Sequence, residues 1–189
     1  MPRRFAPRAK AQGSTKRVSC MKSKSAAGLI DLSWPACHFV RMATKAHRSS
    51  GSFTRTLSIR TSRRTELKDV TAEIEAAVRE SGCSEGVCHL YVPHTTAGVV
   101  INEGDDPAVA RDIEATLGRL VPHRGNYEHA EGNSDSHSKT ALVGSSETVW
   151  IENGRLALGR WQAIFLAEFD GPRTRELRMK VVPDAIAPG

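Results

Sequence analysis

The chain has 189 residues and a net charge of +6, but its 27 Lys and Arg are spread unevenly. Residues 1–64 hold 15 of them against the single acid Asp31, whereas residues 65–189 hold 12 against 20 acids. The positive charge thus belongs to the N-terminal part, and we do not expect the rest of the chain to bind nucleic acid. The four cysteines form no CxxC pair, which argues against a zinc knuckle or a disulfide framework.

The first fifty residues differ from the rest in composition, because they are rich in Arg, Ser and Ala and hold almost no acids. We expect residues 1–51 to be a basic, disordered extension and residues 52–189 to form one domain. An alternative is an organelle transit peptide. A second is that Met42 is the true start, since residues 42–189 carry 18 basic and 20 acidic side chains. No apolar run approaches the ~20 residues that span a bilayer, so we expect a cytoplasmic protein without a membrane partner.

The domain opens with a strand and a helix. Alternating apolar and polar side chains over residues 52–59 predict a half-buried strand. Apolar residues then recur at intervals of three and four between Leu67 and Val78, which predicts an amphipathic helix. Gly82 is expected to end this helix.

Two strands and a second helix are predicted next. Residues 87–92 and 97–102 are rich in β-branched side chains, and Pro93 with the polar run His94–Thr96 separates them. Asp106 followed by Pro107 predicts a helix start, because Asp caps an orphan backbone N–H and proline needs no donor at that position.

The last third of the chain is predicted to be a loop followed by strands. Residues 122–138 contain almost no aliphatic side chain, which indicates a long ordered loop. Strands are expected at residues 140–143, 148–151, 156–158, 161–169 and 175–182. The whole pattern predicts an α+β fold with a β-sandwich, jelly-roll-like core and two to three helices.

Polar residues that could carry chemistry gather in three segments. The first is His94–Thr95–Thr96, the second includes Asn102 and Glu103, and the third is the loop that holds His129, Asp135, His137 and Lys139. Imidazoles and carboxylates together suit a divalent metal site or acid–base catalysis, with solvated loop histidines as the alternative. Near the end, Arg173 and Arg175 lie beside Glu168 and Asp170, which suits either a phosphate clamp or a salt-bridged turn.

Three segments resemble those of a known family. PHTTAGVVINEGDDP at 93–107, YEHAEGNSDSHSKTALVGSS at 127–146 and GRLALGRWQAIFLAEFDGPRTR at 154–175 are similar to signature segments of the YjbQ family. The resemblance implies a β-sandwich protomer in a homotrimer with clefts near the interfaces. It also implies a weak secondary thiamine-phosphate synthase, a transferase that joins hydroxymethylpyrimidine diphosphate to a thiazole phosphate and releases diphosphate.

The resemblance also assigns roles to single positions. The polar residues that match the family cleft are His94, Glu103, His129, Asp135, His137 and Lys139. We expect catalytic roles for His94, Glu103, Asp135 and Lys139; substrate binding by Thr95, Thr96, Asn102, Arg173 and Arg175; and a divalent Zn or Mg ion on His94, His129 and His137. Ser138 departs from the family, whose members often carry a hydrophobic residue there.

Three other functions remain open at this point, the last of them nucleic-acid binding through the basic residues 1–41. The same histidines and carboxylates would suit a metal-dependent hydrolase, in which a bound ion activates water. A non-catalytic trimer that binds a small anionic metabolite is the third reading.

Overall fold

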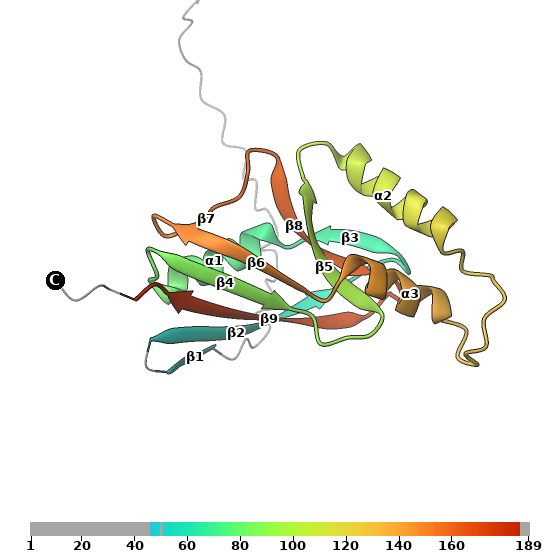
Figure 1. The fold of residues 1–189 in the computed structure, drawn as a ribbon, viewed down its shortest axis with the longest axis horizontal. Coiled ribbons are helices and arrows are strands. Elements are labelled where there is room, and N and C mark those ends of the chain that lie inside the picture. Colours follow the sequence, from blue (N-terminus) through green and yellow to red (C-terminus); the bar gives the residue numbers. More distant parts are fainter. Residues whose placement is uncertain (1–45, 50, 186–189) are drawn as a thin grey trace, which may run out of the picture. The chain divides into compact units, whose positions relative to one another are not determined.

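The computed structural model describes residues 46–49 and 51–185, and side chains from residue 51 onward. Within these residues the chain forms two antiparallel sheets and three helices (Figure 1). The predicted α+β class with a core of two sheets is therefore confirmed. In chain order the elements are β1 (Ala46–Ser49), β2 (Ser52–Arg60), β3 (Glu66–Asp69), α1 (Thr71–Ser81), β4 (Gly86–Tyr91), β5 (Ala97–Glu103), α2 (Pro107–Leu120), α3 (Ser134–Val143), β6 (Ser146–Glu152), β7 (Arg155–Leu156), β8 (Gln162–Glu168) and β9 (Thr174–Pro183).

Strand β9 is the centre of the larger sheet, whose order is β1-β2-β9-β4-β6-β7. It pairs with β2 on one side, where Leu177 lies opposite Leu57, and with β4 on the other, where Met179 lies opposite Leu90. All four side chains are buried, as the two-residue period of a strand requires for one face of a half-buried sheet.

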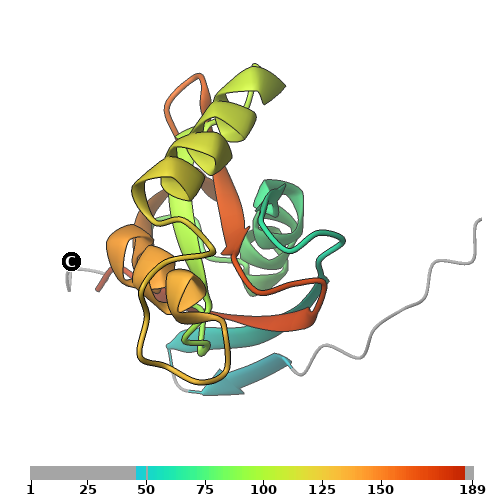
Figure 2. The same ribbon diagram turned by 90° about the vertical axis from the view of Figure 1, so that its right-hand side faces the viewer.

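The smaller sheet has the order β3-β8-β5 and packs over the first sheet with α1 at its side. Ile74 and Val78 of α1 are fully buried in the same core cluster as Ile164 and Leu166 of β8. The alternate residues of β8, Phe165 among them, face a second cluster on the other side of the small sheet. Figure 2 shows α1 on one side of this sheet and α2 with α3 on the other.

Helix α2 begins where predicted. The Asp106 side chain accepts a hydrogen bond from the Ala108 backbone N–H at 2.7 Å, and Pro107 occupies the first turn. Ile113 and Leu117 pack against the cluster around Phe165, although no residue of α2 is fully buried.

Two predicted elements are wrong. Leu67, assigned to the first helix, lies in strand β3, and the helix begins only at Thr71. Residues 122–138 do not form one long loop followed by a strand, because residues 134–143 form helix α3. The buried residues of α3 are polar, namely Asp135, Ser136, Lys139 and Thr140. The sequence therefore contains no apolar stripe from which this helix could be predicted.

The connection from α3 to β6 passes close to β5 and to the end of β4. The Gly144 carbonyl oxygen accepts a hydrogen bond from the Val99 N–H, and the Ser145 carbonyl oxygen accepts one from the Val92 N–H. A Cβ added at Gly98 would collide with the Gly144 carbonyl oxygen, so glycine is required for this approach. Gly144 itself has a φ of 98°, a conformation that other residues rarely adopt.

A buried ion pair joins the two sheets at one end. Glu168 at the end of β8 is fully buried, and Arg175 at the start of β9 is 6% exposed. The Arg175 Nη2 and Nε atoms donate to the two Glu168 carboxylate oxygens at 2.6 and 2.7 Å. Arg175 Nη2 also donates to Thr96 Oγ1, and Thr61 Oγ1 donates to Glu168 Oε2. Chain ends from β2, β5, β8 and β9 are thus fixed together.

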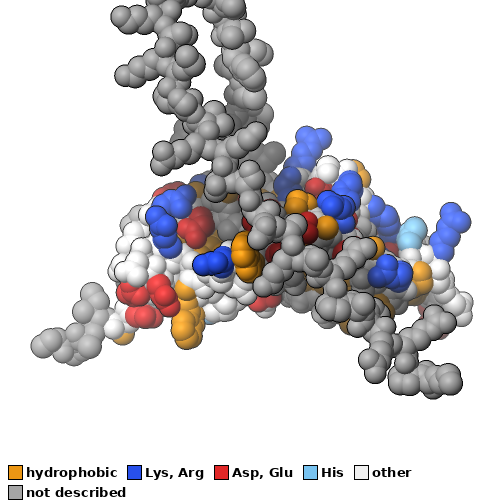
Figure 3. Space-filling view, turned by 90° about the horizontal axis from the view of Figure 1, so that it is seen from above, with side chains coloured by type: hydrophobic (Ala, Val, Ile, Leu, Met, Phe, Trp, Pro, Cys, Tyr) orange, Lys and Arg blue, Asp and Glu red, His pale blue; other side chains and the backbone are white. Residues whose placement is uncertain are grey.

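The start of the described chain bears on the predicted extension of residues 1–51, and the helices and the surface charge bear on the predicted absence of membrane and nucleic-acid partners. Strand β1 pairs with β2 and lies inside the predicted extension of residues 1–51, whereas residues 1–45 lie outside the described residues. No helix in the described part of the chain is long and apolar enough to cross a membrane. On the face seen in Figure 3, Lys and Arg side chains are scattered among Asp and Glu rather than gathered in one patch.

We predict that Arg175→Met destabilises the protein by about 3–5 kcal/mol, because it leaves the Glu168 carboxylate buried without a partner. Chemical denaturation of the full chain measures this change. The control is Arg79→Met, since Arg79 is 61% exposed in its pair with Glu75 and such a helical pair contributes only about 0.3–0.5 kcal/mol. Equal losses in the two variants would contradict the structural role given to Arg175.

Candidate functional site

A concave pocket of about 570 Å³ lies between the loop that follows β4 and one side of α3. It brings together His94 and Thr95 from the loop and His137 from α3, which lie in two separate polar segments of the sequence. The other lining residues are Tyr91, Val92, Pro93, Thr140, Ala141, Gly144 and Ser145. Its position follows from the close approach of Gly144 to β5 described above.

The backbone of β9 holds the His94 ring. The Glu176 N–H donates to His94 Nε2 at 2.9 Å, so the lone pair of this nitrogen is already in use. Burial, and after it the charge of Arg175, lowers the pKa of His94 below its ordinary value. The imidazole is therefore neutral at pH 7 and carries its proton on Nδ1, where it acts as a hydrogen-bond donor.

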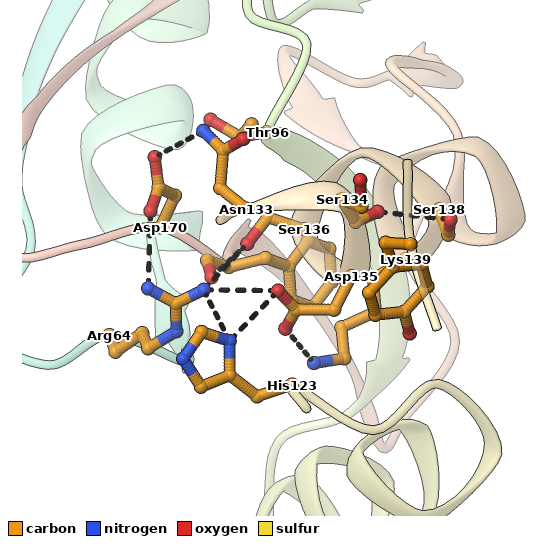
Figure 4. Close-up of polar contacts among 12 residues, drawn as sticks. Arg64, Thr96, His123, Asn133, Ser134, Asp135, Ser136, Ser138, Lys139 and Asp170 are labelled. Carbon is orange, nitrogen blue, oxygen red and sulfur yellow. Dashed lines mark hydrogen bonds and ion pairs between the residues drawn. The ribbon is translucent and has the colours of Figure 1, made fainter. Parts of the chain in front are cut away.

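The inner side of α3 carries a second, separate set of charges (Figure 4). Lys139 and Asp135 are one turn apart, and Lys139 Nζ donates to Asp135 Oδ2 at 2.7 Å. Their side chains are only 4% and 1% exposed. Arg64 Nη2 donates to Asp135 Oδ1 at 3.0 Å, and the His123 ring lies beside the same oxygen.

Asp135 is ionised in this setting. Burial alone would raise the pKa of Asp135, but hydrogen bonds from Lys139 and His123 and the charges of Lys139 and Arg64 lower it overall. Neither Asp135 nor Lys139 lines the pocket of His94 and His137. Their contacts hold α3 in place behind the pocket.

The turn between β8 and β9 connects α3 to the buried ion pair. Ser136 Oγ donates to the Phe169 carbonyl oxygen at 2.6 Å, and Asn133 Nδ2 donates to Asp170 Oδ2 at 3.2 Å. The Phe169 and Asp170 N–H groups in turn donate to Glu168 Oε1. Burial opposes the ionisation of Asp170, but Asn133 and Arg173 lower its pKa overall.

His129 and His137 meet beside the first pocket. Their ring centroids are 5.3 Å apart in an edge-to-face arrangement. Both line a second, open hollow of about 580 Å³ together with Asn126, Tyr127, Glu128, Ser134 and Ser138. His137 thus belongs to both hollows.

The three predicted metal ligands do not form one set in the protomer. His129 and His137 are close enough to share an ion, but the His94 Nε2 lone pair already accepts the Glu176 N–H. Among the described residues, no group of three or more His, Cys, Asp or Glu could hold a metal ion. Of the three predicted ligands, His129 and His137 remain candidates for a metal, and His94 does not fit that role.

Two of the predicted site residues lie far from the pocket. Asn102 and Glu103 end β5, whereas His94 precedes its start, so the seven-residue strand separates them by about 20 Å. The pocket of a single protomer does not include them.

The predicted arginines and Thr96 have structural partners. Arg175 is bound to Glu168 and Thr96, and Thr96 is itself buried. Arg173 donates through Nε to the Asp170 carbonyl oxygen and through Nη2 to the Asp170 carboxylate. Of the two readings of this segment, the structure contains the salt-bridged turn.

Several residues of the site were not singled out from the sequence. Tyr91, Thr140 and Ser145 line the pocket, and Arg64 and His123 hold Asp135. Arg64 and His123 come from loops that precede β3 and follow α2, so no spacing in the sequence links them to Asp135.

Comparison with known proteins identifies the family. A family model described as "UPF0047 protein YjbQ-like" matches residues 55–184. A UPF0047 protein of Methanocaldococcus jannaschii is 51% identical over 126 residues, which are 67% of this chain and 91% of that protein. UPF0047 protein YugU of Bacillus subtilis is 45% identical over 129 residues, which are 68% and 98% of the two chains.

Solved structures agree with this. A YjbQ/UPF0047 family protein of Clostridium acetobutylicum is 47% identical, with a TM-score of 0.66 over 67% of this chain and 98% of that one. A protein of unknown function from Sulfolobus solfataricus is 29% identical, with a TM-score of 0.68 over 70% and 98%. The resemblance drawn from the sequence is confirmed, and the chain belongs to the YjbQ family.

Proposed function

We propose that this protein is a transferase that joins hydroxymethylpyrimidine diphosphate to a thiazole phosphate and releases diphosphate. The family resemblance supplies this pair of substrates. The observation that carries the proposal is the pocket in which His94, held as a neutral donor, shares one concave surface with His137.

The bond changes define what the site must do. The C–O bond between the pyrimidinyl-methyl carbon and the diphosphate breaks, and its electron pair leaves with the diphosphate. The thiazole ring nitrogen gives its lone pair to the same carbon and becomes positively charged. No proton is consumed, so the site needs donors and positive charge around the departing diphosphate more than it needs a base.

His94 can supply one of the hydrogen-bond donors that the departing diphosphate needs. Its Nε2 is fixed by the Glu176 N–H and its pKa is lowered, so Nδ1–H is a preorganised donor. Such a donor costs no reorganisation when negative charge develops on the leaving group. The hydroxyls of Thr95 and Ser145 around the same pocket offer further donors, whereas Thr140 Oγ1 already donates to the Ser136 carbonyl oxygen.

The predicted divalent ion remains part of the proposal at His129 and His137 only. When bound, it would neutralise part of the diphosphate charge. Imidazole ligands favour zinc over magnesium, which prefers oxygen.

We predict that His94→Ala and His137→Ala each lower turnover about a hundredfold, the effect expected when one preorganised group is removed. The full chain is incubated with both phosphates and magnesium, and thiamine phosphate is quantified by chromatography. Arg111→Ala, an exposed change on α2, is expected to leave turnover unaltered. Unchanged turnover in His137→Ala would remove the mechanism, and diphosphate released without joined product would favour hydrolysis instead.

The metal assignment has its own test. Elemental analysis of the purified full chain is expected to find a divalent ion that is lost in the His129→Ala, His137→Ala double variant. His94→Ala is expected to retain the ion, because the Glu176 N–H already occupies the His94 Nε2 lone pair. Loss of metal in His94→Ala would contradict this distinction.

We also propose the homotrimer that the resemblance implies. Leu120 of α2 and Leu142 of α3 are 69% and 64% exposed, and contact with a second protomer would remove their apolar surface from water.

Light scattering of the full chain is expected to give a mass of about three chains. The Leu120→Glu, Leu142→Glu double variant is expected to reduce this mass, because two carboxylates would be buried at the interface. Ala115→Glu, an exposed position of the same α2 helix, serves as the control. A monomeric unaltered chain would refute the assembly, and an equal effect of Ala115→Glu would refute the role of the two leucines.

A further inference from the structure

The outer face of the six-stranded sheet carries a third hollow, of about 250 Å³, apart from the two that His137 lines. Its lining includes Thr56 of β2, His89 and Tyr91 of β4, and Arg178 and Lys180 of β9. In the strand register, His89 lies opposite Lys180 and Tyr91 opposite Arg178. These side chains all lie on the face that points away from the core, because Leu90, Leu177 and Met179 between them are buried.

Two cations of this hollow, Lys180 and Arg178, are open to a ligand, whereas Arg55, which also lines it, is paired with Glu80. Lys180 is exposed and forms no ion pair with any residue that the structure describes. Arg178 pairs with Glu176 at 3.1 Å, but both side chains are more than half exposed, so the pair is weak and easily exchanged. His89 uses one ring nitrogen, Nδ1, in a contact with Thr148 Oγ1 at 2.9 Å and keeps the other.

No carboxylate lines this hollow among the described residues. Arg178 and Lys180 are two positions apart on one strand, or about 7 Å. Two cations at that spacing repel each other, and an anion that bridges them removes the repulsion and forms charge-assisted hydrogen bonds.

The hollow shares one lining residue with the pocket of His94. Tyr91, which is 49% exposed, lines both. On β9, the residue whose N–H holds His94 is Glu176, and Lys180 lies four positions further along the same face. The distance from one to the other is about 13 Å. Tyr91 therefore belongs both to the pocket that holds the His94 donor and to the hollow that holds Lys180 and Arg178.

Arg173 and Arg175, the arginines predicted to bind phosphate, cannot bind an anion here without losing the contacts that stabilise the fold. Arg175 is 6% exposed and paired with Glu168, and Arg173 is bonded twice to Asp170. Of the cations of β9 that face outward in the described chain, Arg178 and Lys180 are the two that line a concave surface.

We propose that this hollow is an anion subsite. Lys180 and Arg178 bind the phosphate group of the second substrate, the thiazole phosphate, and the flat ring of that substrate lies against Tyr91. The identity of that substrate as a phosphorylated heterocycle rests on the proposed function. The subsite itself requires only a phosphate group.

Inorganic phosphate is the probe, titrated calorimetrically into the full chain at fixed ionic strength. Lys180→Met is expected to weaken phosphate binding about tenfold, and Lys180→Met with Arg178→Met to weaken it further. Lys180→Arg should retain it. Arg111→Met on α2 removes the same charge from an exposed position outside the hollow and is expected to change nothing.

Phosphate binding by two variants, His137→Ala and Lys180→Met, distinguishes the anion subsite from the proposed coupling reaction. Phosphate binding that persists in His137→Ala but fails in Lys180→Met supports the subsite, whether or not the coupling reaction is found. Binding that fails in His137→Ala and persists in Lys180→Met would overturn it. An equal loss in Arg111→Met would assign the effect to diffuse charge and would also overturn it.

A nucleic acid is the rival occupant, since aromatic and cationic side chains also suit a single strand. A single-stranded oligonucleotide is titrated in the same way. If it binds through Lys180 and inorganic phosphate does not compete with it, the small-molecule subsite is refuted.

Discussion

The ion pair between Glu168 and Arg175 is the constraint on which the site depends. It joins the last residue of β8 to the first part of β9, and so fixes the two sheets to each other where the pocket opens. Arg175 also binds Thr96, while the next N–H along the chain, that of Glu176, binds His94. One short segment of β9 therefore orients the loop that carries His94.

The Glu168 carboxylate also orients His137, through a longer chain of hydrogen bonds. Glu168 accepts the N–H groups of Phe169 and Asp170, and this turn in turn binds the first residues of α3 through Ser136 and Asn133. Removing one charge from a buried pair leaves the other without compensation, so the pair is costly to disturb. The two histidines of the pocket thus share one buried support, although they are 43 positions apart in the chain.

The sequence predicted most of the apolar framework and less of the polar one. Strands β2, β4, β5, β8 and β9 follow from alternation or β-rich runs, and α2 follows from Asp106 and Pro107. Helix α3 could not be predicted in this way, because Asp135 and Lys139 take the positions that apolar residues normally hold. The two side chains pair with each other, but Asp135 also needs Arg64, which is 71 positions away, and no local pattern contains that information.

The roles of the arginines could have been read from the strand pattern. Leu177, Met179 and Val181 mark the inward face of β9, and Arg175 has the same parity. A cation on the inward face needs a buried partner, which Glu168 provides. Arg178 and Lys180 have the opposite parity and reach solvent. The two-residue period of a single strand therefore separates the arginine that stabilises the fold from the cations that face solvent.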